Sequence, residues 1–277
     1  MAVIRLGAVD YLNARPLVFG LERQTDLFAL RFDPPSRCAE LLHEGAIDVG
    51  MIPSIEFQRG AVPYQIVGGM GIVSEGPVAS VALFSAKAVD NIRSIAVDTS
   101  SRTSTGLLRV LCREKFGIEP EFVPMPPVID SMLGRCDAAL VIGDPALYLD
   151  LNAAGLGKID LGEQWTSMTA LPFVWAFWAG RPGVLTADAL TALREARDAG
   201  VAASDAIADA YCGPDRAALG RAYLRDNIRY VLDEREAAGL QRYYELAARH
   251  GVIDGVRALA FVWEGTKATG SQTKERS

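Results

Sequence analysis

The chain has 277 residues, of which 50% are apolar and 22% charged, and its formal net charge is −6. This composition is typical of a globular protein and excludes a disordered or coiled-coil chain, and the length allows two compact domains. The net charge and the lack of a Lys/Arg-rich run argue against nucleic acid as a partner, because nucleic-acid binding depends on neutralising phosphates. The N-terminal sequence has no secretory pattern and no apolar run is as long as a membrane span, so we expect a cytoplasmic protein with no membrane partner.

The first fifty residues alternate between strands and helices. Short apolar, β-branched runs predict strands over 3–9, 27–35 and 47–52, and prolines end the second one. A helix is predicted over 17–21, after a loop at 10–16, and another over 36–44, capped by Ser36 and ended by Gly45.

The same order returns about ninety residues later. The second copy is predicted as a strand over 94–100, a helix over 101–117, a strand over 121–127, a helix over 128–134 and a strand over 138–142. Two copies of a βαβαβ unit predict parallel strands with right-handed crossovers, hence two lobes. The alternative is one doubly wound domain with six strands.

Two non-helical segments, 80–85 and 171–180, flank the second copy as crossing strands of a hinge would. We therefore predict an α/β fold of two lobes, each a mixed, mainly parallel sheet flanked by helices, with a ligand cleft between them. Lobe 1 is predicted to contain residues 1–84 and 179–264, lobe 2 residues 85–178, and residues 265–277 a disordered tail. Helices predicted over 186–199, 202–211, 216–232 and 233–250 are assigned to lobe 1, the last with a capping box of Asp233 and Glu236 and an end at Gly251.

The loops at the carboxyl ends of the parallel strands should face one site. The most informative loop is residues 100–104, where four hydroxyls and the Arg102 guanidinium stand at the start of a helix. A helix N-terminus with a forked Arg donor suits a carboxylate, and the alternative is an ordinary Ser N-cap with a solvated Arg.

The other loops offer further candidates. Asn13 is expected to face the cleft, and Arg15 either joins it or is solvated. Ser54 and Asp144 follow the third strand of each copy, and they are ligand contacts or helix N-caps. The aromatic run at 173–178 is predicted to be core between the lobes rather than a stacking platform.

Several absences limit the chemistry. The two histidines, His43 and His250, lie in predicted helices away from these loops, so we expect neither a His-based triad nor a metal site. No nucleotide-binding glycine motif follows a strand. The four cysteines are far apart and are predicted to be reduced thiols rather than disulfides or metal ligands; they are Cys38, Cys112, Cys136 and Cys212.

Six segments together resemble the chorismate dehydratases of the futalosine route to menaquinone. They are YLNARPL (11–17), DVGMIPS (48–54), SVALFS (80–85), DTSSRTS (98–104), GDPAL (143–147) and LPFVWAFW (171–178). The resemblance covers nearly all of residues 3–264. It implies a type 2 periplasmic-binding-protein fold used as an enzyme, which removes water from chorismate to give 3-[(1-carboxyvinyl)oxy]benzoate without a cofactor.

On this resemblance the partner is a small dianion, chorismate. The candidate substrate-binding residues are Asn13, Arg15, Ser54, Ser80, Ser100, Ser101, Arg102, Thr103 and Ser104. Asn13 and Asp144 are the candidate catalytic residues, although an amide such as Asn13 cannot serve as the base. The base is Asp144, Glu56 or the enolpyruvyl carboxylate of the substrate itself, and we favour the last because hydroxyls and amides outnumber titratable groups in the predicted cleft.

Two other functions remain open. One is a non-catalytic solute-binding protein for a small carboxylate, because a fold does not fix a function. The other is the sister enzyme 1,4-dihydroxy-6-naphthoate synthase, whose cleft is expected to use histidine. The oligomeric state is left open.

Overall fold

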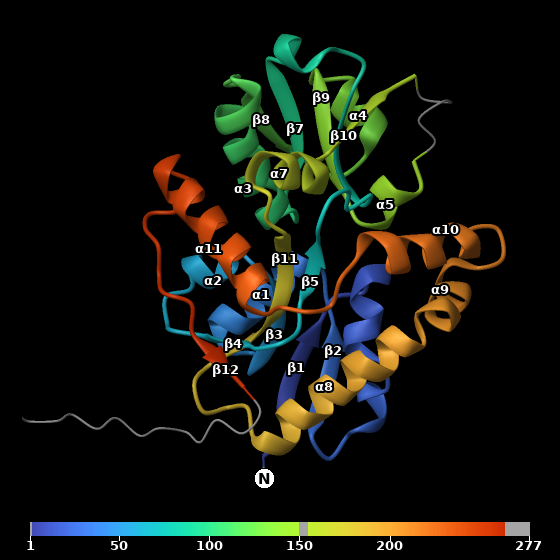
Figure 1. The fold of residues 1–277 in the computed structure, drawn as a ribbon, viewed down its shortest axis with the longest axis vertical. Coiled ribbons are helices and arrows are strands. Elements are labelled where there is room, and N and C mark those ends of the chain that lie inside the picture. Colours follow the sequence, from blue (N-terminus) through green and yellow to red (C-terminus); the bar gives the residue numbers. More distant parts are fainter. Residues whose placement is uncertain (1, 150–154, 264–277) are drawn as a thin grey trace, which may run out of the picture.

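The computed structural model describes residues 2–149 and 155–263, and within this part the chain forms two β-sheets, one above the other in Figure 1. Helices flank both sheets (Figure 1). The predicted disordered tail at 265–277 lies outside the described residues. None of the helices in the described part is long and apolar enough to cross a membrane.

The larger sheet has seven strands among the described residues. They are β1 (Ile4–Ala8), β2 (Phe28–Phe32), β3 (Val49–Pro53), β4 (Gln65–Val67), β5 (Ile72–Ser74), β11 (Phe173–Gly180) and β12 (Phe261–Val262). Their order is β12-β4-β11-β3-β1-β2, and β5 pairs with β11. β1 is parallel to β2 and β3, whereas β11 is antiparallel to β3, β4 and β5.

The smaller sheet has five strands in the described part of the chain. They are β6 (Val81–Ser85), β7 (Ser94–Asp98), β8 (Glu121–Met125), β9 (Ala138–Ile142) and β10 (Gly157–Asp160). Their order is β10-β6-β9-β7-β8, in which β7 is parallel to β8 and β9 and β6 is antiparallel to β9 and β10.

The two sheets repeat one arrangement. In each, the first strand of the copy lies between the second and the third, and an antiparallel strand borders the third, giving β2-β1-β3-β11 and β8-β7-β9-β6. The predicted repeat is confirmed, and the alternative of one sheet with six parallel strands is wrong. The carboxyl ends of β1, β3, β7 and β9 therefore lie where the two lobes meet.

The strand pairing shows that the chain crosses between the lobes earlier than predicted, at both crossings. The predicted boundaries, 84/85 and 178/179, cut through β6, which pairs in the smaller sheet, and β11, which pairs in the larger one. The crossings instead precede β6 and β11. Ala79 (φ 63°) and Ala170 (φ 58°) lie at these two points, and no other non-glycine residue among those described has a positive φ.

The helices of the described part are α1 (Pro35–Glu44), α2 (Glu56–Arg59), α3 (Arg102–Leu111), α4 (Ile129–Leu133), α5 (Asp144–Leu147), α7 (Leu161–Thr169), α8 (Ala187–Ala202), α9 (Ser204–Cys212), α10 (Ala217–Ala222) and α11 (Glu234–Arg249). The Asp233–Glu236 capping box is confirmed, as is the end of α1 at Gly45, where φ is 76°. α8 packs against the 3₁₀ helix Leu12–Val18 and runs diagonally across the lower part of Figure 1, and α11 contacts both β11 and α3.

Three local predictions are wrong. Residues 12–16 of the predicted loop at 10–16 belong to a 3₁₀ helix, Leu12–Val18, because the apolar residues of this segment are buried by tertiary packing. Ser36 does not cap α1, since Pro34 occupies the N-cap position and Pro35 begins the helix. The helix predicted over 216–232 ends in a π-helical turn at Tyr223–Asn227, and extended chain follows from Ile228.

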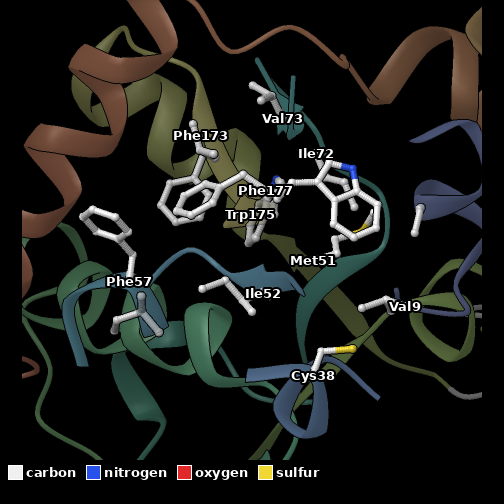
Figure 2. Close-up of a cluster of buried hydrophobic side chains, with 14 of the residues drawn as sticks. Val9, Cys38, Met51, Ile52, Phe57, Ile72, Val73, Phe173, Trp175 and Phe177 are labelled. Carbon is white, nitrogen blue, oxygen red and sulfur yellow. The ribbon is translucent and has the colours of Figure 1, made fainter. Parts of the chain in front are cut away.

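The aromatic residues of β11 are core, as predicted, but they belong to the first lobe. Phe173 and Phe177 are at most 1% exposed, and Trp175 lies edge-on to Phe173 with 4.4 Å between ring centroids (Figure 2). All four cysteines are free thiols, and Cys212 is the one that is partly exposed.

Candidate functional site

A cavity lies at the meeting point of the strand ends, between the two lobes. Its lining includes Val9, Tyr11, Asn13, Met51, Pro53, Ser80, residues 100–104, Ile142, Gly143 and Trp175. These residues come from the ends of β1, β3, β7 and β9, from the first crossing, and from β11. The predicted convergence of the loops after the parallel strands is therefore confirmed.

The start of α3 provides the donors of this cavity. Ser100 gives its backbone N–H and its hydroxyl to the Asp98 carboxylate, at 2.9 and 2.6 Å. Ser101 occupies the N-cap position, but its side chain caps no N–H of the helix. Its Oγ is buried without a hydrogen-bond partner among the described residues. The first turn therefore keeps unpaired N–H groups and an unpaired hydroxyl at the positive end of the helix dipole.

Arg102 lines the cavity, but its guanidinium is already engaged. One nitrogen donates to Glu56 Oε2 at 2.9 Å and the other to Glu40 Oε1 at 2.7 Å. Because Arg102 belongs to the second lobe and both carboxylates to the first, the group ties the lobes together. The expectation that Arg102 offers a free fork to a ligand is wrong.

Thr103 and Ser54 form a second tie between the lobes. Thr103 Oγ1 accepts the backbone N–H of Ile55 at 3.2 Å and lies 3.5 Å from Ser54 Oγ, while the Tyr243 hydroxyl donates to the Thr103 carbonyl at 3.1 Å. Ser54 is fully buried and lies behind the lining rather than in it. Ser104, by contrast, lines the cavity.

Asn13 and Ser80 both form hydrogen bonds to Tyr223, a residue that the sequence did not predict for the site. Asn13 Nδ2 donates to Tyr223 Oη at 3.0 Å, and the hydroxyls of Ser80 and Tyr223 are 2.7 Å apart. Tyr223 is 2% exposed, and burial raises its pKa, so the ring stays a neutral phenol. It orients two polar side chains of the cavity from a helical segment more than 140 residues away.

Arg15 and Asp144 lie outside the lining. The Arg15 guanidinium pairs with Asp10 and stands 5.3 Å from the ring centroids of both Phe32 and Tyr211. Tyr211 also donates its hydroxyl to Asp144 Oδ2. Burial raises the pKa of Asp144, while the hydrogen bonds from Tyr211 and from a backbone N–H act to lower it. Asp144 thus joins the lobes, and the structure does not bring Arg15 to the cavity.

Glu56, the other candidate base, sits behind Arg102. Its carboxylate is within 3.3 Å of His43 Nε2, 3.0 Å of Arg59 Nη1 and 2.9 Å of Arg102 Nη1. Burial acts to raise its pKa, but the hydrogen bond from His43 and the two guanidiniums outweigh it and hold the pKa at about 2. The expectation that His43 lies away from the loops is wrong, because it contacts this carboxylate, although it does not line the cavity.

Tyr11 and Trp175 are lining residues that were not predicted. Tyr11 is half-buried, and burial, with Asp98 and Asp144 nearby, raises its pKa. The Trp175 indole N–H donates to Ser74 Oγ at 3.0 Å, which fixes the ring as an apolar wall. Among the described residues of the lining, the titratable side chains are those of Tyr11 and Arg102. No group of His, Cys, Asp and Glu in the described part of the chain is arranged to hold a metal ion.

Comparisons with known proteins identify a family and a relative that this chain resembles. A family model described as menaquinone biosynthesis matches residues 4–249. The chain is 28% identical over 262 residues to the chorismate dehydratase of Thermus thermophilus, covering 87% of this chain and 93% of that protein.

Solved structures show the same fold. A protein of Archaeoglobus fulgidus superposes with a TM-score of 0.74 at 19% identity, covering 90% of this chain and 98% of that one. The periplasmic aliphatic sulphonate binding protein of Escherichia coli superposes with a TM-score of 0.61 at 19% identity, covering 99% and 96%. The fold is that of the two-lobed periplasmic binding proteins.

Proposed function

The chain belongs to the menaquinone biosynthesis family, and from this premise we propose that its cleft binds chorismate and eliminates water from it, as a hydro-lyase. The observation that carries the proposal is the Ser101 hydroxyl, which is buried in the lining of the cavity and has no partner among the described residues. A carboxylate oxygen of the ligand would accept a hydrogen bond from this hydroxyl, and N–H groups of the first turn of α3 would donate to the same carboxylate.

The remaining lining suits the rest of chorismate. The molecule is a dianion with a cyclohexadiene ring, so it needs polar contacts at its carboxylates and apolar contact on its ring. Asn13 and Ser80, held by Tyr223, offer amide and hydroxyl groups on the side of the first lobe. Trp175 and Met51 supply apolar surface between them.

The reaction removes the proton from ring C3 and the hydroxyl from ring C4. Loss of both makes the ring aromatic, so the elimination is strongly downhill. The ring carboxylate acidifies the C3 proton through the adjacent double bond, and negative charge builds on that carboxylate in a stepwise route. Donors at the start of α3 would stabilise this charge as it forms.

The base in this proposal is the enolpyruvyl carboxylate of the substrate. The lining places no carboxylate or imidazole of the described residues in the cavity. Glu56, with a pKa of about 2 and three cationic or hydrogen-bonding partners, is a weak base, and Asp144 is directed toward Tyr211. The substrate carboxylate takes the C3 proton, and the carboxylic acid so formed gives it to the departing C4 hydroxyl, which leaves as water.

Purified protein incubated with chorismate tests the proposal. We expect the absorbance of an aromatic product and a mass lower than that of chorismate by one water. Tight binding of chorismate without turnover would instead favour a solute-binding protein, the activity of the Escherichia coli neighbour with the same fold.

A further inference from the structure

A second cavity lies outside the cleft, between the outer face of α3 and the C-terminal end of α11, which stand side by side in Figure 1. Its volume is about 520 Å³. Arg109 and Phe122 line it from the second lobe, and Arg59, His250 and Val252 line it from the first. The two cavities meet at the first turn of α3, where Ser101 and Arg102 line both.

The lining of this second cavity is cationic in an acidic protein. Arg102, Arg109 and Arg113 are spaced by seven and four residues, which places them on one face of α3 and the turn that follows it. With Arg59, four arginines line the cavity against two carboxylates, those of Asp98 and Glu119, which is a formal excess of two positive charges. The whole chain has a net charge of −6.

Arg109 is the arginine whose charge is not neutralised. Arg59 and Arg102 pair with Glu56, and Arg113 pairs with Glu119 at 2.9 Å. Arg109 has no ion pair within the described part of the chain, and its guanidinium carbon lies 4.1 Å from the centroid of the Phe122 ring. Desolvation lowers its pKa most, and the like charges of Arg113 and Arg59 also lower it, whereas Cys112 acts to raise it. Although the Arg109 side chain is exposed, a cation that has no carboxylate partner in the described part of the chain and lies near two other guanidiniums attracts an anion.

The lobes are in close contact beside this cavity. A Cβ atom added at Gly106 would stand 2.4 Å from Tyr243 Oη and 2.7 Å from Ile55 Cδ1, so glycine permits α3 to touch the first lobe here. Arg59 of the first lobe and Arg109 and Arg113 of the second line the same cavity, so a ligand there can contact arginines of both lobes.

We propose that this cavity binds a small phosphoryl dianion, held by Arg109 with Arg59 and Arg113. Guanidinium groups that reach the cavity from two lobes suit a tetrahedral oxyanion, whose oxygens point in several directions, better than a planar carboxylate, which one fork satisfies. Because both lobes supply donors, the bound dianion would stabilise the arrangement of the lobes described above.

Calorimetric titration of the full chain with inorganic phosphate tests this inference, at mildly alkaline pH, at constant ionic strength and without chorismate. We expect saturable binding at one site that Arg109→Met weakens by about tenfold or more, since Met keeps the apolar contact with Phe122 but not the charge. Arg113→Met should weaken it as well. Arg135→Met is the matched control, because Arg135 is an exposed arginine of the same lobe outside the cavity and its loss should leave the affinity unchanged.

Three results would overturn the proposal. One is the absence of saturable heat at millimolar phosphate, and another is an equal affinity for phosphate in Arg109→Met and Arg135→Met. The third is binding that Asn13→Ala removes while both arginine variants keep it, because the anion would then lie in the cleft. If Arg109→Met fails to fold by circular dichroism, Arg113→Met decides the matter, since its side chain is 47% exposed. None of these outcomes depends on chorismate turnover.

Discussion

Replacing Glu56 by Gln tests whether Glu56 is the catalytic base or a structural contact that holds the two lobes together. A fall in the pKa of Glu56 from its ordinary 4.5 to about 2 corresponds to about 3 kcal/mol of stability at neutral pH, since each pKa unit is worth about 1.4 kcal/mol. The side chain is 2% exposed, so solvent screens this contribution little. We therefore expect Glu56→Gln to lower the free energy of unfolding at neutral pH by roughly 2–4 kcal/mol, because it removes the buried charge that pairs with Arg59 and Arg102 and leaves a neutral amide among their guanidiniums.

The pH dependence has a definite sign. A carboxyl group whose pKa is lower in the folded state stabilises the fold fully above its unfolded pKa, so this contribution is present above pH 4.5 and is lost as the pH falls toward 2. Urea denaturation at neutral and at acidic pH should show the difference between wild type and Glu56→Gln shrinking in acid. Glu40→Gln is the control, because Glu40 also binds Arg102 but is 42% exposed, and it should cost under about 1 kcal/mol.

Turnover of chorismate completes the test. With the substrate carboxylate as the base, Glu56→Gln retains a near-native kcat. The reasoning is refuted if Glu56→Gln is no less stable than Glu40→Gln, or if kcat falls by about a thousandfold while the protein stays folded and still binds chorismate.

Three further changes give clear expectations. Asp144→Asn should keep near-native kcat in the absorbance assay, because Asp144 faces Tyr211 rather than the cavity; a thousandfold loss with binding intact would make it the base. Ser101→Ala should raise KM for chorismate about tenfold without lowering the urea midpoint, since it removes an unpaired buried hydroxyl, and an unchanged KM would contradict this. Ala79→Val should cost about 2 kcal/mol of unfolding free energy and Ala79→Gly little, because φ is 63° there, and equal urea midpoints for the two would refute a strained crossing.

The repeat made the fold predictable because its signals are local. Apolar runs, prolines and glycines mark each strand and helix of the two copies, and the order of the elements then restricts the topology. Strands β4, β5, β10 and β12 were missed because each is two to four residues long and is defined by its pairing partner rather than by a pattern of its own.

The site was predictable only as far as backbone position. The strand ends placed Asn13 and residues 100–104 at the cavity correctly, and Ser80, a candidate on the family resemblance, also lines it. Charge pairing depends on the tertiary structure, so no sequence pattern near Arg102 shows that its guanidinium forms ion pairs with Glu40 and Glu56. Tyr223 could not be found for the same reason, because it reaches Asn13 from 210 residues away.

The position of β11 sets an order for folding. β11 lies between β3 and β4 in the larger sheet, yet it follows the entire second lobe in the chain. During synthesis β4 has no sheet partner until β11 emerges, since it pairs with β11 and β12 among the described strands. The smaller sheet is continuous in sequence from β6 to β10, so it can form before β11 is made, while the β3 edge of the larger sheet is still unpaired. The first lobe to begin is therefore the last to finish, and its unpaired β3 edge is the part of the nascent chain most exposed to misassembly.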